Sequence, residues 1–218
     1  MKAEIEKWAL KYEGNEVIRS LIKLVPSGIG SAIDSFISIR LNKLLRKRKR
    51  VFFTEIASGK KHLTPEMIDS DDFLHAFFKT TDAAMRTHRV EKIRLFARIL
   101  KNAALSDSLK NVDEYEEYLQ ILDELSLREI GILTIMDGLS EESSGAGHLN
   151  RYVKDWNQFF LEVQSTYHVE RAECIATLMR MNRTGCYSVG YIQTAKDFAG
   201  GYLTPIWTKL KTLVSVSE

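Results

Sequence analysis

The residues in this chain whose types and spacing most suggest chemistry are positive charges gathered on one short segment. The stretch SFISIRLNKLLRKRKRVFF, residues 35–53, places seven Lys and Arg in the eleven positions from Arg40 to Arg50. Cations at this density bind phosphates, and neutralised phosphates supply most of the non-specific affinity for nucleic acids. The candidate nucleic-acid-binding residues here are Arg46, Lys47, Arg48, Lys49 and Arg50, with Lys60, Lys61, Arg89 and Arg94 as further candidates.

Two other uses of this charge are open from the sequence. Long Lys and Arg side chains can lie over a helical bundle and pair with an acidic helix of the same chain. Such a helix is present in SDSLKNVDEYEEYLQILDEL, residues 106–125, which carries seven Asp and Glu against one Lys. Alternatively, an apolar stripe containing Phe36, Ile37 and Leu41 could insert into a membrane surface while the basic face meets anionic lipid.

Patterns that would indicate an enzyme or a metal site are weaker. Asp71, Asp72 and His75 lie within one helical turn and could ligate a metal, but capping of a helix N-terminus explains both aspartates without one. The segment SGIGSAID, residues 27–34, has neither the Gly-Lys-Ser/Thr ending nor the preceding strand of a phosphate-binding loop. We therefore expect a non-enzymatic protein with no cofactor, no metal and no small-molecule substrate.

The composition favours a mostly α protein that folds without disulfides. The 218 residues are 44% hydrophobic and include only three prolines, so helix interiors are seldom interrupted. Cys174 and Cys186 fit no redox or zinc spacing and are expected to be free thiols. The N-terminal residues mix charged and apolar types, unlike a signal peptide, and residues 20–39 carry too much charge for a membrane span. We expect a cytoplasmic protein.

Charge divides the chain into a basic and a slightly acidic part. Residues 1–125 hold 22 Lys and Arg against 19 Asp and Glu, a balance of about +3, whereas residues 126–218 hold 9 against 10, about −1. The first part is predicted to be a bundle of four or five helices with short connections. Its longest helix starts at Ser31 or Ser35 and ends near Gly59, and another starts at Ser70 or Asp71. We place the domain boundary after residue 125.

The second part, residues 126–218, mixes helices with short strands. Ser126 with Glu129 has the spacing of a capping box, and ESSGAGH, residues 142–148, is predicted to be a loop or linker. Helices are predicted in residues 149–164 and 168–184, with Gly185 closing the second. An extended run over residues 186–192, a β segment over 202–204, and a helix opened by Pro205 follow. Three helices followed by strand, loop and strand form the layout of a winged helix.

Two stretches carry a family resemblance. Leu178 to Cys186, with Gly185 before its last residue, and Gly201-Tyr-Leu-Thr-Pro205 together resemble the Leu-x-x-Leu-x-x-x-Gly-Leu and Tyr-x-Leu-Thr signature of bacterial winged-helix domains. The resemblance covers about the last 90 residues, and it departs from the pattern at Met181, Cys186 and Ile206-Trp207. The first half is similar in style to uncharacterised bacterial helical proteins, a likeness that carries no functional residues.

The resemblance implies that the third helix of the winged helix could enter the major groove of DNA. Its candidate nucleic-acid-binding residues are Arg171, Arg180 and Arg183, but Glu170 and Glu173 stand at the end of the helix that would meet bases. The second part also lacks the positive charge that non-specific DNA affinity requires. Our hypothesis is a regulatory or defence-related protein that binds nucleic acid through the basic helix and the winged helix. The alternatives are a protein-interaction or self-association module, or a peripheral membrane-surface binder.

Overall fold

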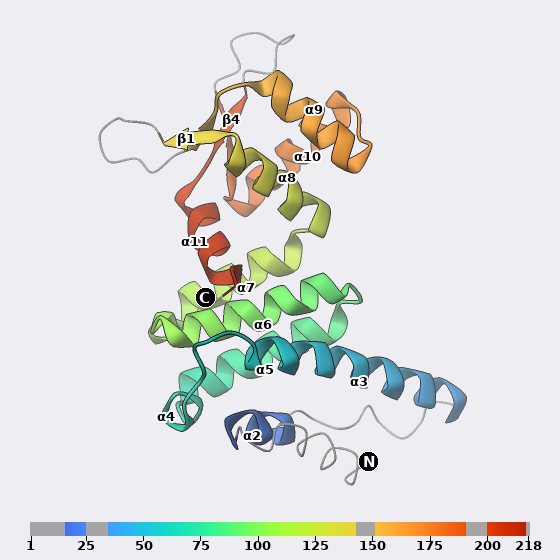
Figure 1. Cartoon of the computed structure of the whole chain (residues 1–218), viewed down its shortest axis with the longest axis vertical. Coiled ribbons are helices and arrows are strands. Elements are labelled where there is room, and N and C mark those ends of the chain that lie inside the picture. The colour runs from blue at the N-terminus through green and yellow to red at the C-terminus, as the bar shows by residue number, and fades with distance from the viewer. Residues whose placement is uncertain (1–15, 25–34, 143–150, 191–199, 217–218) are drawn as a thin grey trace. The chain divides into compact units, whose positions relative to one another are not determined.

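The computed structural model describes residues 16–24, 35–142, 151–190 and 200–216 of the chain (Figure 1). These residues form two compact units. Unit 1 comprises Met1–Leu119 with Leu213–Glu218, and unit 2 comprises Gln120–Thr212. The predicted domain boundary lies after residue 125, whereas the division between the units falls inside a helix, between Leu119 and Gln120.

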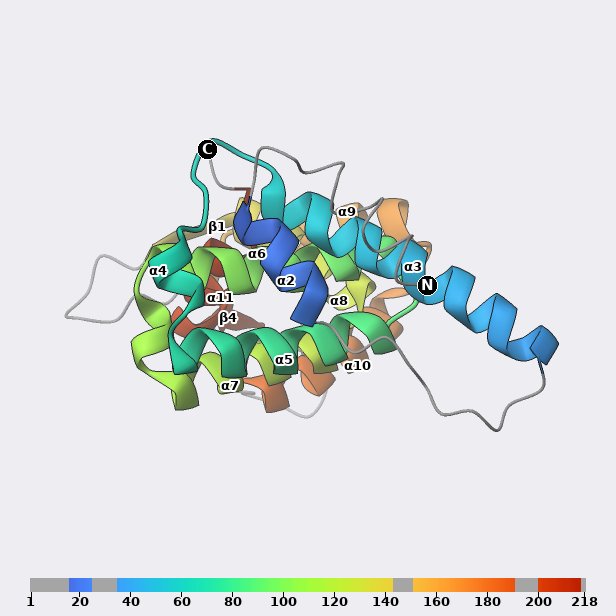
Figure 2. The same cartoon turned by 90° about the horizontal axis from the view of Figure 1, so that it is seen from below.

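Unit 1 is built from helices alone within its described residues. They are α2 (Glu16–Leu24), α3 (Ser35–Ala57), α4 (Pro65–Ile68), α5 (Asp71–Arg86), α6 (Val90–Leu105), a 3-10 turn η1 (Ser108–Lys110) and the larger part of α7 (Val112–Glu124). α3 packs along α6 and also contacts α5 and α2, and α5 packs along α6. The first turns of α3 continue past the end of α5 (Figure 2).

An aromatic cluster forms the centre of this bundle. Phe52 and Phe53 of α3 are fully buried and meet edge to face, with ring centroids 5.5 Å apart. Phe53 lies 6.3 Å from Phe77 of α5, which stacks on Phe73 at 6.2 Å. Rings in such arrangements contribute about 0.5–1.5 kcal/mol per pair beyond the area they bury. The apolar side of α3 beyond residue 51 is therefore part of the core.

Local signals in the sequence fix the helix ends in unit 1. α3 ends at Ala57, just before Gly59 with its φ of 81°, whereas its start, predicted at Ser31 or Ser35, lies at the edge of the described residues. Ser70 caps α5, because its Oγ accepts a hydrogen bond from the Phe73 N–H at 3.2 Å. Serine is favoured at this position because its hydroxyl satisfies an N–H that has no partner within the helix. The predicted end of α3 and the predicted start of α5 are confirmed.

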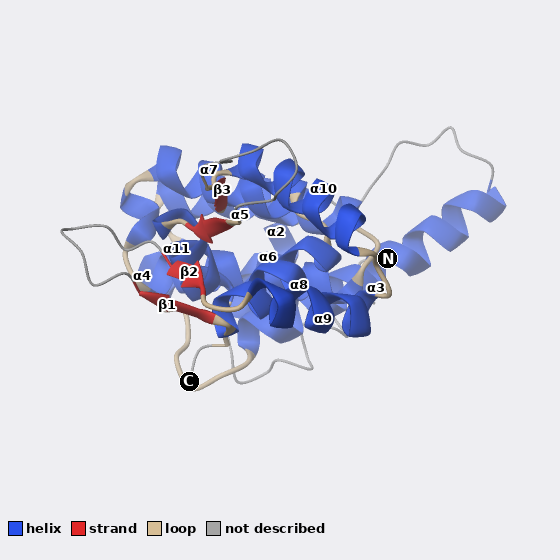
Figure 3. Cartoon of the chain, turned by 90° about the horizontal axis from the view of Figure 1, so that it is seen from above, coloured by secondary structure: helices blue, strands red, loops and turns tan. Residues whose placement is uncertain are grey.

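Unit 2 combines helices with a small antiparallel sheet, drawn in red in Figure 3. After the end of α7, its elements are α8 (Leu127–Gly138), β1 (Ser140–Glu142), β2 (Arg151–Val153), α9 (Trp156–Tyr167), α10 (Arg171–Met181), a 3-10 turn η2 (Asn182–Thr184), β3 (Tyr187–Val189), β4 (Gly201–Leu203) and most of α11 (Pro205–Val214). The strand order is β1-β2-β4-β3. In register, Tyr152 faces Tyr202, which in turn faces Ser188. The mostly α class with a small sheet is confirmed.

The order of elements from α8 to β4 is that of a winged helix with one extra strand, β1. β2 lies between the first and second helices and pairs with β4, which also pairs with β3. Gly185 has a φ of 73°, as predicted, and turns the chain from η2 into β3. Pro205 opens α11, also as predicted. The predicted loop over residues 142–148 falls almost entirely outside the described residues, and of the extended run predicted over 186–192 the described part contains β3.

One helix prediction in this unit is wrong at its start. Residues 149–164 were expected to be helical throughout, but Arg151–Val153 is strand β2 and the helix begins at Trp156. The Asp155 side chain accepts hydrogen bonds from the N–H groups of Asn157 and Gln158, at 2.8 and 3.1 Å. An aspartate cap placed here stops the helix from extending backward, and aromatic and β-branched residues before it favour strand pairing.

Candidate nucleic-acid interface

The outward side of α3 is a row of cations. Lys43, Arg46, Lys47 and Arg50 are all exposed, and their steps of three and four residues place them on one side of the helix. The opposite side buries Phe52, Phe53 and Ile56. The four exposed cations are named here the α3 basic face. Along the helix they span about 10 Å, because each residue adds roughly 1.5 Å.

Arg48 and Lys49, two of the five candidates on this helix, turn toward the protein. Arg48 is half-buried and its Nη1 donates to the main-chain carbonyl of Met85, in the last turn of α5. That carbonyl lies at the negative end of a helix, where a cation is favoured. Lys49 is also half-buried, and loss of water around its ammonium lowers its pKa. These two side chains are less suited to phosphate contact than Arg46, Lys47 and Arg50.

Further along α3, Glu55 forms ion pairs with two arginines of α6. Its carboxylate accepts a hydrogen bond from Arg98 Nε at 2.6 Å and lies 3.9 Å from Arg94 Nε. Arg94, a candidate from the sequence, therefore faces a carboxylate within its own unit. Lys60, Lys61 and Arg89 are exposed, as a phosphate contact would require.

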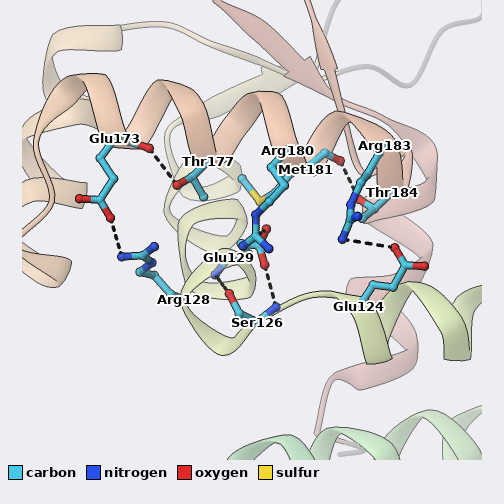
Figure 4. A network of polar contacts seen from close by, with 10 residues as sticks. All are labelled: Glu124, Ser126, Arg128, Glu129, Glu173, Thr177, Arg180, Met181, Arg183 and Thr184. Atoms are coloured by element: carbon cyan, nitrogen blue, oxygen red, sulfur yellow. Dashed lines mark hydrogen bonds and ion pairs between the residues drawn. The ribbon is translucent and has the colours of Figure 1, made fainter.

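In unit 2, the three cationic candidates each meet a partner within the unit. The Arg171 guanidinium lies over the ring of Phe160, 4.5 Å from its centroid. Arg180 Nη2 is 2.6 Å from the carboxylate of Glu129, and Arg183 Nη2 is 3.8 Å from that of Glu124 (Figure 4). Each of these cations of α10 and η2 therefore contacts a side chain of its own unit.

Glu129 is a residue whose second role the sequence did not indicate. The predicted capping box is present: Ser126 Oγ accepts from the Glu129 N–H at 3.2 Å, and the Glu129 carboxylate accepts from the Ser126 N–H at 2.8 Å. The same carboxylate, which is only 3% exposed, also pairs with Arg180 of α10. Glu173 at the other end of α10 pairs with Arg128 at 2.8 Å. Ion pairs thus link both ends of α10 to the start of α8.

The three residues considered as metal ligands, Asp71, Asp72 and His75, have other roles in the structure. His75 Nε2 is 2.6 Å from the carboxylate of Glu116 on α7, and Lys79 is also 2.6 Å from it. Asp71 and Asp72 occupy the first turn of α5 behind the Ser70 cap. Within the described ranges, no three His, Cys, Asp or Glu side chains gather as metal ligands would.

Comparison with known proteins adds no assignment to these residues. No protein-family model, no curated protein and no solved structure matches the chain. Across the described helices, none has both the length and the apolar character needed to cross a membrane. Any function must therefore be argued from the side chains themselves.

Proposed function

We propose that this chain is a non-enzymatic binding protein that holds the phosphate backbone of a nucleic acid on the α3 basic face. The observation that carries the proposal is the exposure of Lys43, Arg46, Lys47 and Arg50 together on one side of α3, opposite the buried aromatic side. A rigid row of cations about 10 Å long suits successive phosphates, since helix geometry fixes the separation of its side chains.

The winged-helix resemblance of unit 2 belongs to the same proposal, but with a narrower role. The element order and the sheet pairing support a winged helix, whereas Glu170 and Glu173 at the N-terminal end of α10 disfavour the approach of phosphates and bases to this helix. We therefore assign phosphate binding to α3 alone, and not jointly to α3 and α10.

The membrane-surface alternative receives less support from α3. Insertion needs an apolar side beside the basic one. Among the described side chains of α3, Phe52, Phe53 and Ile56 belong to the core of unit 1, and Leu44, which is 42% exposed, is a single apolar group beside the basic face. Phe36, Ile37 and Leu41, on which that hypothesis was based, are residues whose side chains fall outside the description.

The test is fluorescence anisotropy of a labelled duplex of about 30 base pairs, titrated with the full chain at several salt concentrations. Four phosphate contacts predict a slope of roughly −3 to −4 in log K against log salt, since each contact contributes about −0.9. Absence of binding at low salt overturns the proposal, and binding to anionic vesicles alone would assign the face to a lipid surface.

Two double variants that remove the same number of positive charges distinguish binding by α3 from binding by unit 2. Lys47→Gln with Arg50→Gln is expected to weaken binding about tenfold or more and to lower the slope by about 2, because two phosphate contacts are lost. The matched control, Arg171→Gln with Arg183→Gln, removes the same charge from unit 2 and is expected to leave the slope unchanged. Arg48 is kept in every variant, because its hydrogen bond to Met85 supports the fold.

A further inference from the structure

The exposed side of α10 has a composition that neither phosphate binding nor burial explains. Ala172, Ala176 and Met179 are exposed at steps of four and three residues, and Met179 retains 42% of its surface. Glu173 and Arg180 flank this row on the side of α8 (Figure 4). These five residues are named here the α10 outer face. The other side of the helix buries Cys174, Thr177, Leu178 and Met181.

This face is poorly suited to reading a base sequence. A recognition helix needs donors and acceptors that reach base edges. The middle of the α10 outer face offers two methyl groups and a thioether, which bring only apolar contact. A row of this kind is instead typical of a helix that packs on another helix, where small residues allow close approach and a long one fills the hole beside them.

The charges on the face are arranged so that it complements itself. Glu173 lies toward the N-terminal end of α10 and Arg180 toward its C-terminal end, both on the same flank. In an antiparallel pair of α10 helices related by a two-fold axis near Ala176, the flank that carries Glu173 and Arg180 in one copy lies beside the same flank of the other copy. Residue 173 of each copy then faces residue 180 of the other, and residue 172 faces residue 179. Each carboxylate meets an arginine, and each methionine meets an alanine.

We propose that the α10 outer face binds the same face of a second copy of this chain, in an antiparallel two-fold arrangement. Such an interface is isologous, so every favourable contact occurs twice. The proposal is independent of phosphate binding by α3.

The ion pairs already present on the flank are compatible with this arrangement. Arg128 and Glu173 are 43% and 50% exposed, and Arg180 is 48% exposed, so their outer sides remain accessible to a second molecule. Pairing would extend them into a row of alternating charge: Arg128 and Glu173 of one copy, followed by Arg180 and Glu129 of the other. Arginine presents five N–H donors, enough to serve two carboxylates.

The interface is small, which determines how it must be measured. One 11-residue helix packed on its counterpart buries less than a standard interface of about 1,600 Å², so the dimer is expected to be weak and dependent on concentration. Sedimentation velocity of the full chain from about 10 µM to about 1 mM is expected to show a reversible monomer–dimer equilibrium. A monomer throughout this range overturns the proposal, whichever other partner the face might bind.

Substitutions at the axis test the geometry. Ala176→Arg places two like charges next to each other and is expected to weaken dimerisation at least tenfold, whereas Gln164→Arg, at an exposed position of α9, is expected to leave it unchanged. Dimerisation that survives Ala176→Arg overturns the proposed interface. Circular dichroism checks that each variant is folded.

A cysteine at the axis supplies a second, milder test. In the proposed pair, Ala176→Cys brings two thiols close enough for a disulfide, since small residues allow interaxial distances of about 8 Å. Oxidation should give a covalent dimer for Ala176→Cys and none for Gln164→Cys. The native thiols at Cys174 and Cys186 are buried and should not contribute. Absence of the covalent dimer would contradict the antiparallel register.

Discussion

The Lys101 ammonium, on α6, donates a hydrogen bond to the main-chain carbonyl of Ser58, one residue past the end of α3. Lys101 is 3% exposed, and burial lowers the pKa of its ammonium, an effect that the nearby charge of Glu55 partly offsets. The terminal carbonyls of a helix have no partner within it and carry partial negative charge. Lys101 therefore caps the C-terminal end of α3, the helix that carries the α3 basic face.

This contact predicts that Lys101 contributes to stability and not to nucleic-acid binding. Lys101→Met keeps the apolar stem but leaves the Ser58 carbonyl without its donor, at an expected cost of about 1–3 kcal/mol in the free energy of unfolding. Urea denaturation followed by circular dichroism measures it. Lys110→Met is the control, since Lys110 forms an exposed pair with Asp107 and should change stability by less than about 0.5 kcal/mol. Equal effects of both variants would contradict the assigned role.

A second prediction concerns the asymmetric pair of Glu129 and Arg180. The Glu129 side chain is 3% exposed and that of Arg180 is 48% exposed. Removing the arginine therefore leaves a buried carboxylate without its ion-pair partner, whereas neutralising the glutamate leaves no buried charge. Arg180→Met is expected to cost about 3 kcal/mol. Glu129→Gln, which can still accept the Ser126 N–H, is expected to cost about 1 kcal/mol.

Chemical denaturation of the two variants measures this difference. Arg183→Met is the matched control because its pair with Glu124 is longer, 3.8 Å, and exposed on both sides. It should alter stability by less than about 0.5 kcal/mol. A larger loss for Glu129→Gln than for Arg180→Met would contradict the prediction, because it would show that the unpaired carboxylate is not the costlier state.

A third prediction concerns the two thiols of unit 2. Burial raises the pKa of both Cys174 and Cys186 to about 11, and the charge of Glu173 adds to the effect at Cys174. Since the thiolate is the reactive form, both should react with Ellman's reagent at about pH 8 far more slowly than a free cysteine. Two thiols should react promptly once the chain is unfolded in guanidinium. Rapid reaction of the folded chain would contradict the burial of these residues.

The elements of this protein that the sequence predicts are those with local causes. The cap of α5 at Ser70, the capping box of Ser126 and Glu129, the turn at Gly185 and the helix opened by Pro205 each depend on neighbours within a few residues. Such signals act through the chemistry of single turns and need no knowledge of the rest of the fold.

The remaining features depend on contacts between distant residues. β2 has only three residues, too few to show an alternating pattern, and it becomes a strand by pairing with β4 fifty residues later. The pairing of Arg180 with Glu129 likewise joins separate helices. The inward orientation of Arg48 could be predicted from the sequence, because Arg48 lies one helical turn before the buried Phe52 and therefore on the same side of the helix. Counting the charges of the segment does not show on which side of the helix each one lies.

The last prediction follows from Glu116, whose carboxylate lies 2.6 Å from both Lys79 Nζ and His75 Nε2 of α5. Hydrogen bonds from Lys79 and then His75 hold the pKa of this carboxyl below its usual value of 4.5. Because the folded pKa lies below the unfolded one, the stabilisation is fully present above about pH 4.5 and is lost as pH falls through the folded pKa. Wild type should therefore be more stable than Glu116→Gln at neutral pH.

This advantage over Glu116→Gln should shrink steadily as the pH of the urea titrations is lowered from about 6 to about 3. Glu117→Gln, at an adjacent exposed position, supplies the control and should show no such dependence. An advantage of wild type that grew as the pH fell would have the wrong sign for a carboxylate with a lowered pKa. It would show that Lys79 and His75 of α5 do not stabilise the charged form of Glu116 on α7.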